Sequence, residues 1–332
     1  MAFDDPSFSL SLAVQAATQA LGGARDLVDI HHALGLPLLM TASPTDAGVR
    51  EWALLARDAF LMQAAPCLGL TIRALHPPEA ARGLACAAEF RQHFDASYAP
   101  LIRRALEHQQ IVLAWQGWER EAEGLWGIIT AEDSRGVGFS GFPFPVEPSP
   151  DDRPPARLLH RPPIQFYVIE SITCTVIDEI GWAQAAVRHT AAALQADLGA
   201  RFGVLTGAPA YRRWAKVLRD AKPPNEQDFP SIFAHAELAR SVLTGLECFF
   251  LGLRKMRDFG IAETLDVQRL SDYARSIQQE MTQVRELLAV ISAPGAITNV
   301  PAVIDTLHRT ADLTERTSAQ WNYTTAQNPD GR

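Results

Sequence analysis

The chain has 332 residues, 47% hydrophobic and 20% charged, a composition typical of a soluble globular protein with one large or two ordinary domains. Its 30 basic and 38 acidic residues give a formal net charge of −8, which argues against a nucleic-acid-binding protein. The acidic start at residues 1–6 and the lack of an apolar run of roughly 18 to 20 residues predict a cytoplasmic protein without a signal peptide or membrane partner.

The first half of the chain predicts two helices and several short strands. An Ala- and Leu-rich helix is expected over residues 8–20, and a second over 46–64, after turn-forming residues at 43–46. Apolar runs of strand length follow, and a proline-dense segment before the last of them is expected to be a long loop without regular structure. The expected strands are 69–74, 110–115, 124–131, 136–141 and 164–169, and the expected loop is 142–163.

The runs 124–131 and 136–141 are predicted to pair as an antiparallel hairpin, because one polar turn separates two apolar stretches. Residues 136–141 also match the glycine spacing of a dinucleotide-binding loop. Pro143 and Pro145 exclude the helix that such a loop requires, so the segment is interpreted as a glycine-tolerant strand.

From residue 178 onward the apolar residues recur at helical spacing. The expected helices are 179–198, 207–220, 230–258, 266–292 and 300–320. One of them predicts a single buried stripe at Val267, Leu270, Tyr273, Ile277, Met281, Val284 and Leu288. Tyr211 and Trp214 are expected to face the core together. Residues 242–253 are apolar around nearly the whole helix, so they must be covered either by the following helices or by a second subunit in a homodimer.

The order of these elements and the Ala-Tyr-x-x-Trp-x-x-x-Leu pattern at 210–218 resemble a bacterial group related to the N-terminal domain of butirosin biosynthesis protein H. That group belongs to the C39-like, papain-fold superfamily. The matching segments are 26–40, 105–114, 124–141 and 207–214. The resemblance implies an α+β fold, with a papain-like (cysteine-peptidase-like) mixed core that contains a small antiparallel sheet, followed by a C-terminal helical bundle. The implied domains are a core at 1–222, a helical region packed on it at 223–325, and a polar tail at 326–332.

Catalysis in a papain-like protein needs a thiolate at the start of the first helix, an imidazole on the hairpin strand, and a group that orients the imidazole. This chain offers Ser7 and Ser9 at the helix start, Leu125 or Trp126 at the histidine position, and only Asp133 for the third role. A serine hydroxyl without a base is a weak nucleophile at neutral pH. We therefore expect no conventional catalysis, with Ser7 and Ser9 as capping or first-turn residues.

His31 and His32 form the only adjacent histidine pair. Neighbouring side chains usually diverge, so joint metal binding would need further ligands, and we expect no metal site. The pair is interpreted as helix-terminal residues with capping or solvent contacts, and contact with a ligand in a cleft is the alternative. The cysteines lie among apolar residues and are expected to be buried thiols. They are Cys67, Cys86, Cys174 and Cys248.

Aromatic and acidic residues crowd the segment before the hairpin. Trp118 follows Gly117 in a charged turn and is expected to be exposed, so Trp118 and Glu119 are candidates for binding a cationic or amine-bearing ligand. Arg212 and Arg213 are candidates for binding a carboxylate or phosphate, although a solvated helix face is the favoured interpretation.

Two hypotheses from different classes follow. In the first, the chain is a catalytically silent papain-like protein that binds a small molecule or peptide, or assembles with a carrier protein, in a bacterial biosynthetic or accessory pathway, without a cofactor. In the second, it is an acyltransferase or amide hydrolase of the butirosin biosynthesis protein H type with a nonstandard catalytic set, such as Ser9 with His31 or His32. The missing hairpin histidine favours the first hypothesis.

Overall fold

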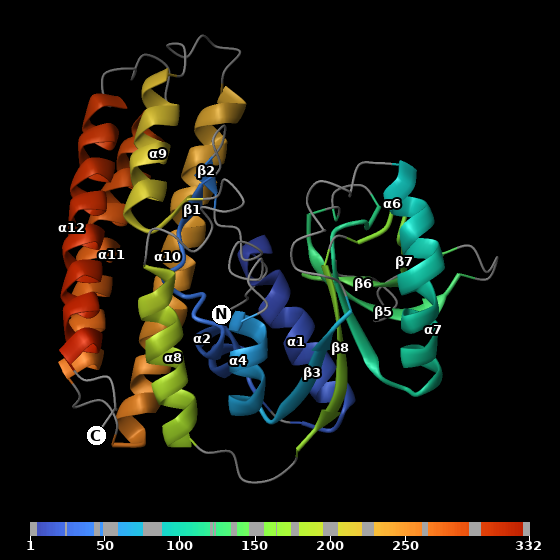
Figure 1. Ribbon diagram of the computed structural model, residues 1–332. Coiled ribbons are helices and arrows are strands. Elements are labelled where there is room, and N and C mark those ends of the chain that lie inside the picture. Colours follow the sequence, from blue (N-terminus) through green and yellow to red (C-terminus); the bar gives the residue numbers. More distant parts are fainter. Residues whose placement is uncertain are drawn as a thin grey trace, which may run out of the picture. The chain divides into compact units, whose positions relative to one another are not determined.

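The computed structural model of the chain shows a mixed α+β protein that forms two compact units (Figure 1). Unit 1 comprises Met1–Ile30 and Leu55–Asp178, and unit 2 comprises His31–Leu54 and Glu179–Arg332. The chain therefore passes between the units three times. The division at residue 222 that the sequence suggests stays a prediction. The structure describes residues 5–23, 25–42, 47–48, 59–75, 88–119, 122, 124–133, 138–145, 156–163, 165–173, 179–194, 205–220, 229–260, 265–291 and 300–327.

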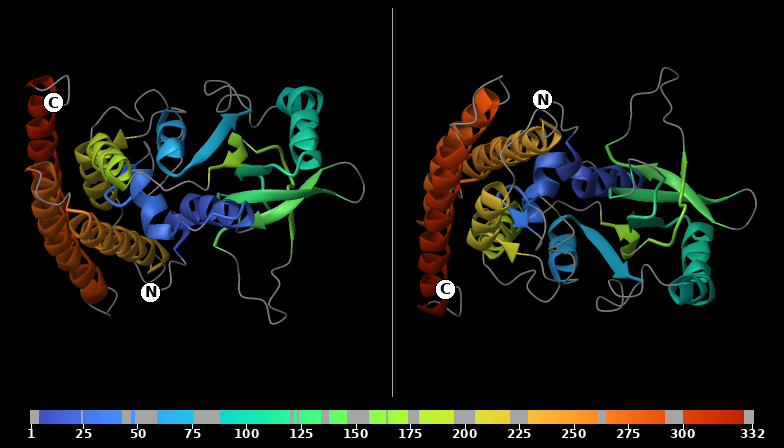
Figure 2. Two further views of the ribbon diagram at one scale, coloured as in Figure 1. Left: turned by 90° about the horizontal axis from the view of Figure 1, so that it is seen from below. Right: turned by 90° about the horizontal axis from the view of Figure 1, so that it is seen from above.

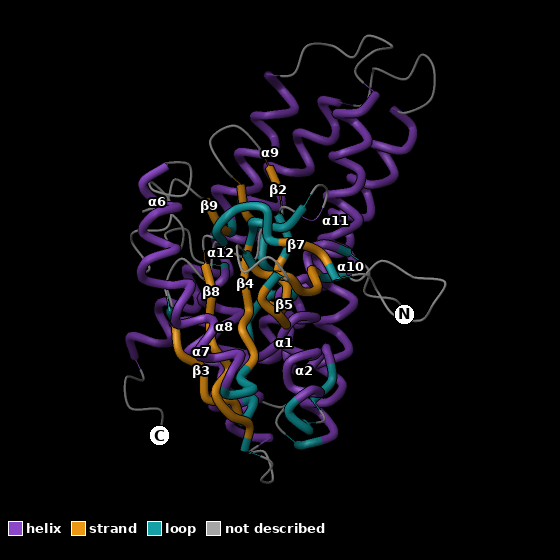
Figure 3. The backbone as a smooth tube through the Cα atoms, turned by 90° about the vertical axis from the view of Figure 1, so that its right-hand side faces the viewer, coloured by secondary structure: helices purple, strands orange, loops and turns teal. Residues whose placement is uncertain are grey.

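Unit 1 is built on a six-stranded antiparallel sheet with the strand order β3-β8-β4-β5-β6-β7, whose central strands are seen in Figure 3. The strands are β3 (Leu70–Ala74), β4 (Ile111–Trp115), β5 (Trp126–Glu132), β6 (Phe139–Pro143), β7 (Arg157–Leu158) and β8 (Gln165–Ile172). The helical elements of this unit are a 3-10 turn (Pro6–Phe8), α1 (Ser9–Ala20), α4 (Ala59–Cys67), α6 (Ala88–His93), a π-helical turn (Phe94–Tyr98) and α7 (Ala99–Glu107). Helix α2 (Leu27–Ala33) crosses the boundary between the two units.

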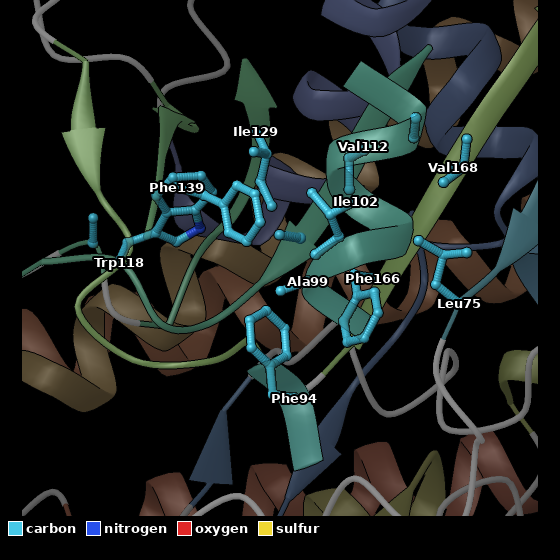
Figure 4. Close-up of a cluster of buried hydrophobic side chains, with 13 residues drawn as sticks. Leu75, Phe94, Ala99, Ile102, Val112, Trp118, Ile129, Phe139, Phe166 and Val168 are labelled. Atoms are coloured by element: carbon cyan, nitrogen blue, oxygen red, sulfur yellow. The ribbon is translucent and has the colours of Figure 1, made fainter. Parts of the chain in front are cut away.

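Helices α7 and α1 cover opposite faces of this sheet (Figure 2). On the α7 side, Ala99, Ile102 and Ala105 recur at a spacing of three and bury one stripe of the helix against the strands. Figure 4 shows this cluster, whose strand residues are Val112, Ala114, Ile129, Phe139, Phe166 and Val168. Because successive side chains of a strand point to opposite faces, the alternate residues Leu113 and Trp115 of β4 face α1.

Most of the expected strands in this unit are confirmed. Strands β3, β4 and β8 match the runs 69–74, 110–115 and 164–169, and α1 matches the helix expected over 8–20. The predicted hairpin is also confirmed, because β5 and β6 pair antiparallel with Ile129 opposite Gly141.

The pairing of β5 with β6 requires a glycine at position 141. A Cβ atom at this position would overlap the carbonyl oxygen of Ile128 on β5. Glycine is therefore needed where the two strands approach and the register between them shifts.

Two expectations about the first half of the chain are wrong in part. Within the range predicted as a helix over 46–64, Ala47–Gly48 form strand β2, residues 59–64 lie in α4, and residues 49–58 lie outside the described residues. Here the antiparallel pairing of β2 with the preceding strand β1 (Thr41–Ala42) outweighs local helix propensity. The segment 142–163 is predicted to lack regular structure, yet β6 extends to Pro143 and Arg157–Leu158 pair with it as β7. A short edge strand of this kind is compatible with prolines around it.

Unit 2 is mainly helical, and all five helices expected in the second half of the chain are confirmed. They are α8 (Glu179–Ala193), α9 (Ala208–Asp220), α10 (Phe229–Asp258), α11 (Leu265–Ile291) and α12 (Val300–Gln327). A small antiparallel sheet joins β2 (Ala47–Gly48), β1 (Thr41–Ala42) and β9 (Leu205–Thr206). Helix α12 packs on both α9 and α11 (Figures 1 and 2). Within the described part of the chain, no helix has the length and apolarity needed to cross a membrane.

The seven stripe positions predicted for α11 are all buried, and so are Tyr211 and Trp214 of α9, as expected. Tyr273 of α11 shares a hydrogen bond of 2.9 Å with Thr314 of α12. Helix α12 contains a stripe of buried threonines, and the hydroxyl of each donates to the carbonyl oxygen four residues earlier. The hydrogen-bond donors of this buried polar stripe are therefore paired within the helix. These threonines are Thr306, Thr310, Thr314 and Thr317.

The apolar middle of α10 is covered on two sides within unit 2. Helix α11 packs along it, and residues 31–42 approach another side at two glycines. A Cβ atom at Gly245 would lie 2.7 Å from the carbonyl oxygen of Pro37, and one at Gly252 would overlap the ring of His32. The chain thus supplies intramolecular cover for α10, and the homodimer stays a prediction.

Candidate functional site

The start of α1 lies against the first residue of β5. The carboxylate of Asp5 accepts a hydrogen bond of 2.9 Å from the backbone nitrogen of Ser7, in the turn that leads into the helix. Ser9 is the first residue of α1 and is only 3% exposed. Its Oγ accepts a long hydrogen bond of 3.4 Å from the backbone nitrogen of Trp126. The first turn of the first helix and the first residue of the hairpin are therefore neighbours.

The cap of this helix differs from the expected one. Phe8 occupies the N-cap position, and its apolar side chain cannot accept a hydrogen bond. The buried carboxylate of Asp5 instead bonds within the preceding turn, where its negative charge also stabilises the positive end of the helix dipole. Ser9 lies in the first turn, as expected, whereas no sequence pattern indicates the role of Asp5.

Three side chains form a row across the sheet at this end. Trp115 of β4 pairs with Trp126 of β5 on one side and with Gln165 of β8 on the other, so all three point to the α1 face. Their exposed fractions are 6%, 1% and 5% in that order. The ring of Trp126 also lies near β8, with its centroid 6.1 Å from that of Tyr167. We call Trp115, Trp126 and Gln165 the sheet-end row.

Two polar atoms of the sheet-end row are buried and unpaired. The indole nitrogen of Trp115 donates a 3.0 Å hydrogen bond to the carbonyl oxygen of Gly124. In contrast, Nε1 of Trp126 and Oε1 of Gln165 have no hydrogen-bond partner in the part of the chain that the structure describes. Buried polar groups of native proteins are nearly always hydrogen-bonded. These two atoms therefore indicate a site where a bound molecule could supply the missing acceptor and donor.

Trp118 is fully buried, which contradicts the expected exposure. Gln116 and Gly117 both have positive φ, +66° and +90°, and turn the chain directly after β4. Trp118 then bridges to Leu159 and packs in the α7-side cluster shown in Figure 4. Its ring is therefore not available on the surface for a cation. Glu119, the other candidate in this segment, is half-buried.

Asp133 lies at the opposite end of β5 from Trp126. Seven residue steps of extended chain separate them, about 23 Å at the usual rise of a strand. The structure therefore does not bring Asp133 to the Ser9 contact. Phe144 contacts the first residue of β5 instead: its backbone nitrogen donates a 2.8 Å hydrogen bond to the carbonyl oxygen of Trp126.

His31 and His32 lie in the last turn of α2, as expected, but the expected solvent contacts are wrong because they are 2% and 0% exposed. Nε2 of His32 donates to the carbonyl oxygen of Cys248 on α10 at 3.1 Å, and Nδ1 of His189 on α8 donates to the carbonyl oxygen of Ala33. Burial, and secondarily the neighbouring His32, lowers the pKa of His31 well below its ordinary value. Burial also lowers the pKa of His189, although its bond to Ala33 opposes the shift. The imidazoles of His32 and His189 thus join the C-terminal end of α2 to α10 and α8.

We expect acid to destabilise the protein through these buried histidines. The folded-state pKa of His31 lies below its unfolded value of about 6.5, so its contribution is complete above that pH and is lost as the pH falls. The loss approaches about 1.4 kcal/mol per pH unit for each such histidine. Urea unfolding of His31→Gln should show a shallower loss between about pH 6.5 and 5.5 than the wild type. An unchanged slope in His31→Gln would contradict the prediction.

Gly252→Ala should lower the free energy of unfolding by about 1 to 3 kcal/mol, although alanine favours a helix over glycine by about 1 kcal/mol. The added methyl group would overlap the His32 ring, which stacks on Phe249 at 5.5 Å and bonds to Cys248. Urea unfolding measures the difference. Gly124→Ala is the matched control, because no heavy atom lies within 4 Å of the position that its methyl group would take. Equal stability of the two variants would mean that the ring moves aside freely.

The remaining candidates are the cysteines and a metal site. Cys248 is buried as expected, whereas Cys67 is half-buried after Pro66 at the end of α4, and two cysteines lie outside the described residues, Cys86 and Cys174. Among the described residues, no group of three or more histidine, cysteine, aspartate or glutamate side chains is placed to hold a metal ion.

Arg212 binds carboxylates of its own chain. Its Nη2 contacts Glu315 and, at 3.2 Å, Asp312, both on α12. The hydrogen bond to Glu315 and then the one to Asp312 raise the pKa of the guanidinium. The arginine thus links α9 to α12, and an external carboxylate or phosphate would have to compete with these two side chains. Arg213 is half-buried on the same helix.

The fold and this site define a mixed α+β protein with an aromatic, buried sheet end where its first helix meets its hairpin. No protein-family model matches the chain, and a search of curated proteins finds no match. The likeness to papain-like proteins therefore stays a prediction from the residues of the chain itself.

Proposed function

We propose that the chain is a catalytically silent papain-like protein that binds a small molecule or peptide, or assembles with a carrier protein, in a bacterial biosynthetic or accessory pathway. The contact between Ser9 and Trp126 carries this proposal. It joins the start of the first helix to the first position of the hairpin strand, the two places where a papain-like enzyme needs its nucleophile and its base. In this chain the two places hold a hydroxyl and an indole.

The chemistry of this pair supports binding over catalysis. An indole nitrogen donates hydrogen bonds only and cannot take the proton of a serine hydroxyl, so Ser9 and Trp126 do not form a nucleophile and base. Phe144, which bonds to the backbone of Trp126, has no side-chain group that could orient a base. Aromatic rings with a few polar atoms are instead typical of ligand sites.

Covalent labelling tests the proposal against the competing acyltransferase or amide hydrolase. Native protein is treated with a serine-directed fluorophosphonate and separately with a thiol-directed chloromethyl ketone, and labelling is followed by intact mass. We expect no rapid label at Ser9 or at any cysteine, whereas the urea-unfolded protein should react at its four cysteines. Rapid stoichiometric modification of one native serine or cysteine would overturn the proposal and favour the enzyme.

A further inference from the structure

The two unpaired atoms of the sheet-end row are complementary in kind. Nε1 of Trp126 is a hydrogen-bond donor, and Oε1 of Gln165 is an acceptor. Both side chains point to the α1 face, and the Trp126 ring reaches across β4 to Tyr167, the next residue of β8 on the same face as Gln165. A donor and an acceptor without hydrogen-bond partners therefore lie on the same face of the sheet, on either side of β4, and both side chains are at least nine-tenths buried.

A ligand held there should be neutral. The sheet-end row contains no charged residue, and the nearby start of α1 already faces the carboxylate of Asp5. An anion would meet that negative charge. Burying any ligand charge without a counter-charge is costly, because ions lose their hydration on entering a protein interior.

We propose that this face binds a neutral ligand through a carboxamide group, whose carbonyl oxygen accepts from Nε1 of Trp126 and whose N–H donates to Oε1 of Gln165. Trp126 and Gln165 stand on strands two spacings apart, about 10 Å between backbones, which suits a planar group with separate donor and acceptor atoms better than a single hydroxyl. Trp115, which stands between Trp126 and Gln165 in the row, and Tyr167 supply aromatic rings beside the ligand. The inference rests on the proposed non-catalytic binding function and specifies its ligand class.

The test follows the indole N–H resonances of the full-length protein by nitrogen-15 NMR, with the Trp126 signal assigned from Trp126→Phe. Acetamide is titrated against methyl acetate, which lacks the N–H donor, 2-propanol and acetate ion. We expect acetamide to shift the Trp126 signal saturably. Methyl acetate should bind about tenfold more weakly because it leaves Gln165 unpaired, and the alcohol and the anion should give no saturable shift. Trp214, whose indole already donates to His235 at 3.0 Å, should not respond.

Gln165→Leu provides the matched variant, since leucine fills a similar space with an apolar side chain and removes the hydrogen-bond acceptor. Its preference for acetamide over methyl acetate should disappear. The proposal is overturned if acetamide leaves the Trp126 signal unmoved, if 2-propanol binds as well as acetamide, or if Gln165→Leu keeps the tenfold preference for acetamide over methyl acetate. The first two outcomes are read on the wild-type protein, so they do not depend on the variant folding.

The same samples separate this inference from the proposed function. Ammonia released from acetamide would reveal catalysis and overturn the non-catalytic function while the binding mode could still stand. Absence of both acetamide binding and covalent labelling would overturn the carboxamide site alone.

Discussion

The double variant Ser9→Cys/Trp126→His should hold a thiolate near pH 5, several pH units below the titration of an ordinary cysteine at about 8.5. The expectation follows from the contact between Ser9 and the first residue of β5, which would bring a thiol and an imidazole side by side. An imidazolium beside a thiol favours the thiolate and lowers its pKa to about 3.5 to 7.5 in known cases. The ultraviolet absorbance of the thiolate, followed against pH, measures the shift without a reagent having to enter the site.

Ser9→Cys/Trp126→Gln is the control for the space opened by removing the indole, because glutamine has no imidazole. Its thiol should titrate at or above about 8.5, since burial among apolar groups disfavours the charged form. Alkylation near pH 5 should be on the order of tenfold to a hundredfold faster in the histidine variant, since the larger thiolate fraction outweighs the weaker nucleophilicity of a low-pKa thiol. Equal titration of the two folded variants would contradict a papain-like arrangement of these positions.

Gly141→Ala should destabilise the protein by about 3 kcal/mol or more, the largest effect we expect from a single methyl group in this chain. The added Cβ would overlap the carbonyl oxygen of Ile128, a backbone atom inside the β5–β6 pairing that cannot swing away as a side chain can. The usual gain from replacing glycine in a strand, roughly 0.5 to 1 kcal/mol, is too small to offset this overlap. Urea unfolding followed by tryptophan fluorescence measures the loss.

Gly138→Ala is the comparison for that experiment, because its nearest neighbour is the carbonyl oxygen of Leu159 at 3.8 Å, an ordinary contact. We expect its free energy of unfolding to stay within about 0.5 kcal/mol of the wild type. Similar losses in both variants would show that glycine is required throughout the hairpin turn and not specifically where β6 meets Ile128.

The elements that local periodicity defines could be predicted from the sequence. The α11 stripe repeats at steps of three and four, and all its members are buried. The hairpin likewise needs only two apolar runs and a polar turn between them, and both strands form. In these cases the pattern that specifies the element is contained within the element itself.

Several of the predictions that fail depend on partners far away in the chain. The charged sequence neighbours of Trp118 predict a ring in solvent, but its partner is Leu159, 41 residues later in the chain, and the ring is buried. The position of His32 at a helix end predicts contact with water, whereas a glycine 220 residues later makes room for its ring. No local pattern reveals such a fit, and none reveals the sheet-end row, which only the pairing of three strands assembles.

The long-range partners of residues 31–42 also matter while the chain is being made. His32 bonds to Cys248, 216 residues later, and at about 5 to 20 residues per second the ribosome needs roughly 10 to 40 s to synthesise that interval. Throughout this time the apolar stretch from Leu34 to Met40, which is buried in the finished protein, waits for α8 and α10 to emerge. The nascent chain thus offers a hydrophobic segment to chaperones, or to premature association with its neighbours on a polysome, well before unit 2 can close.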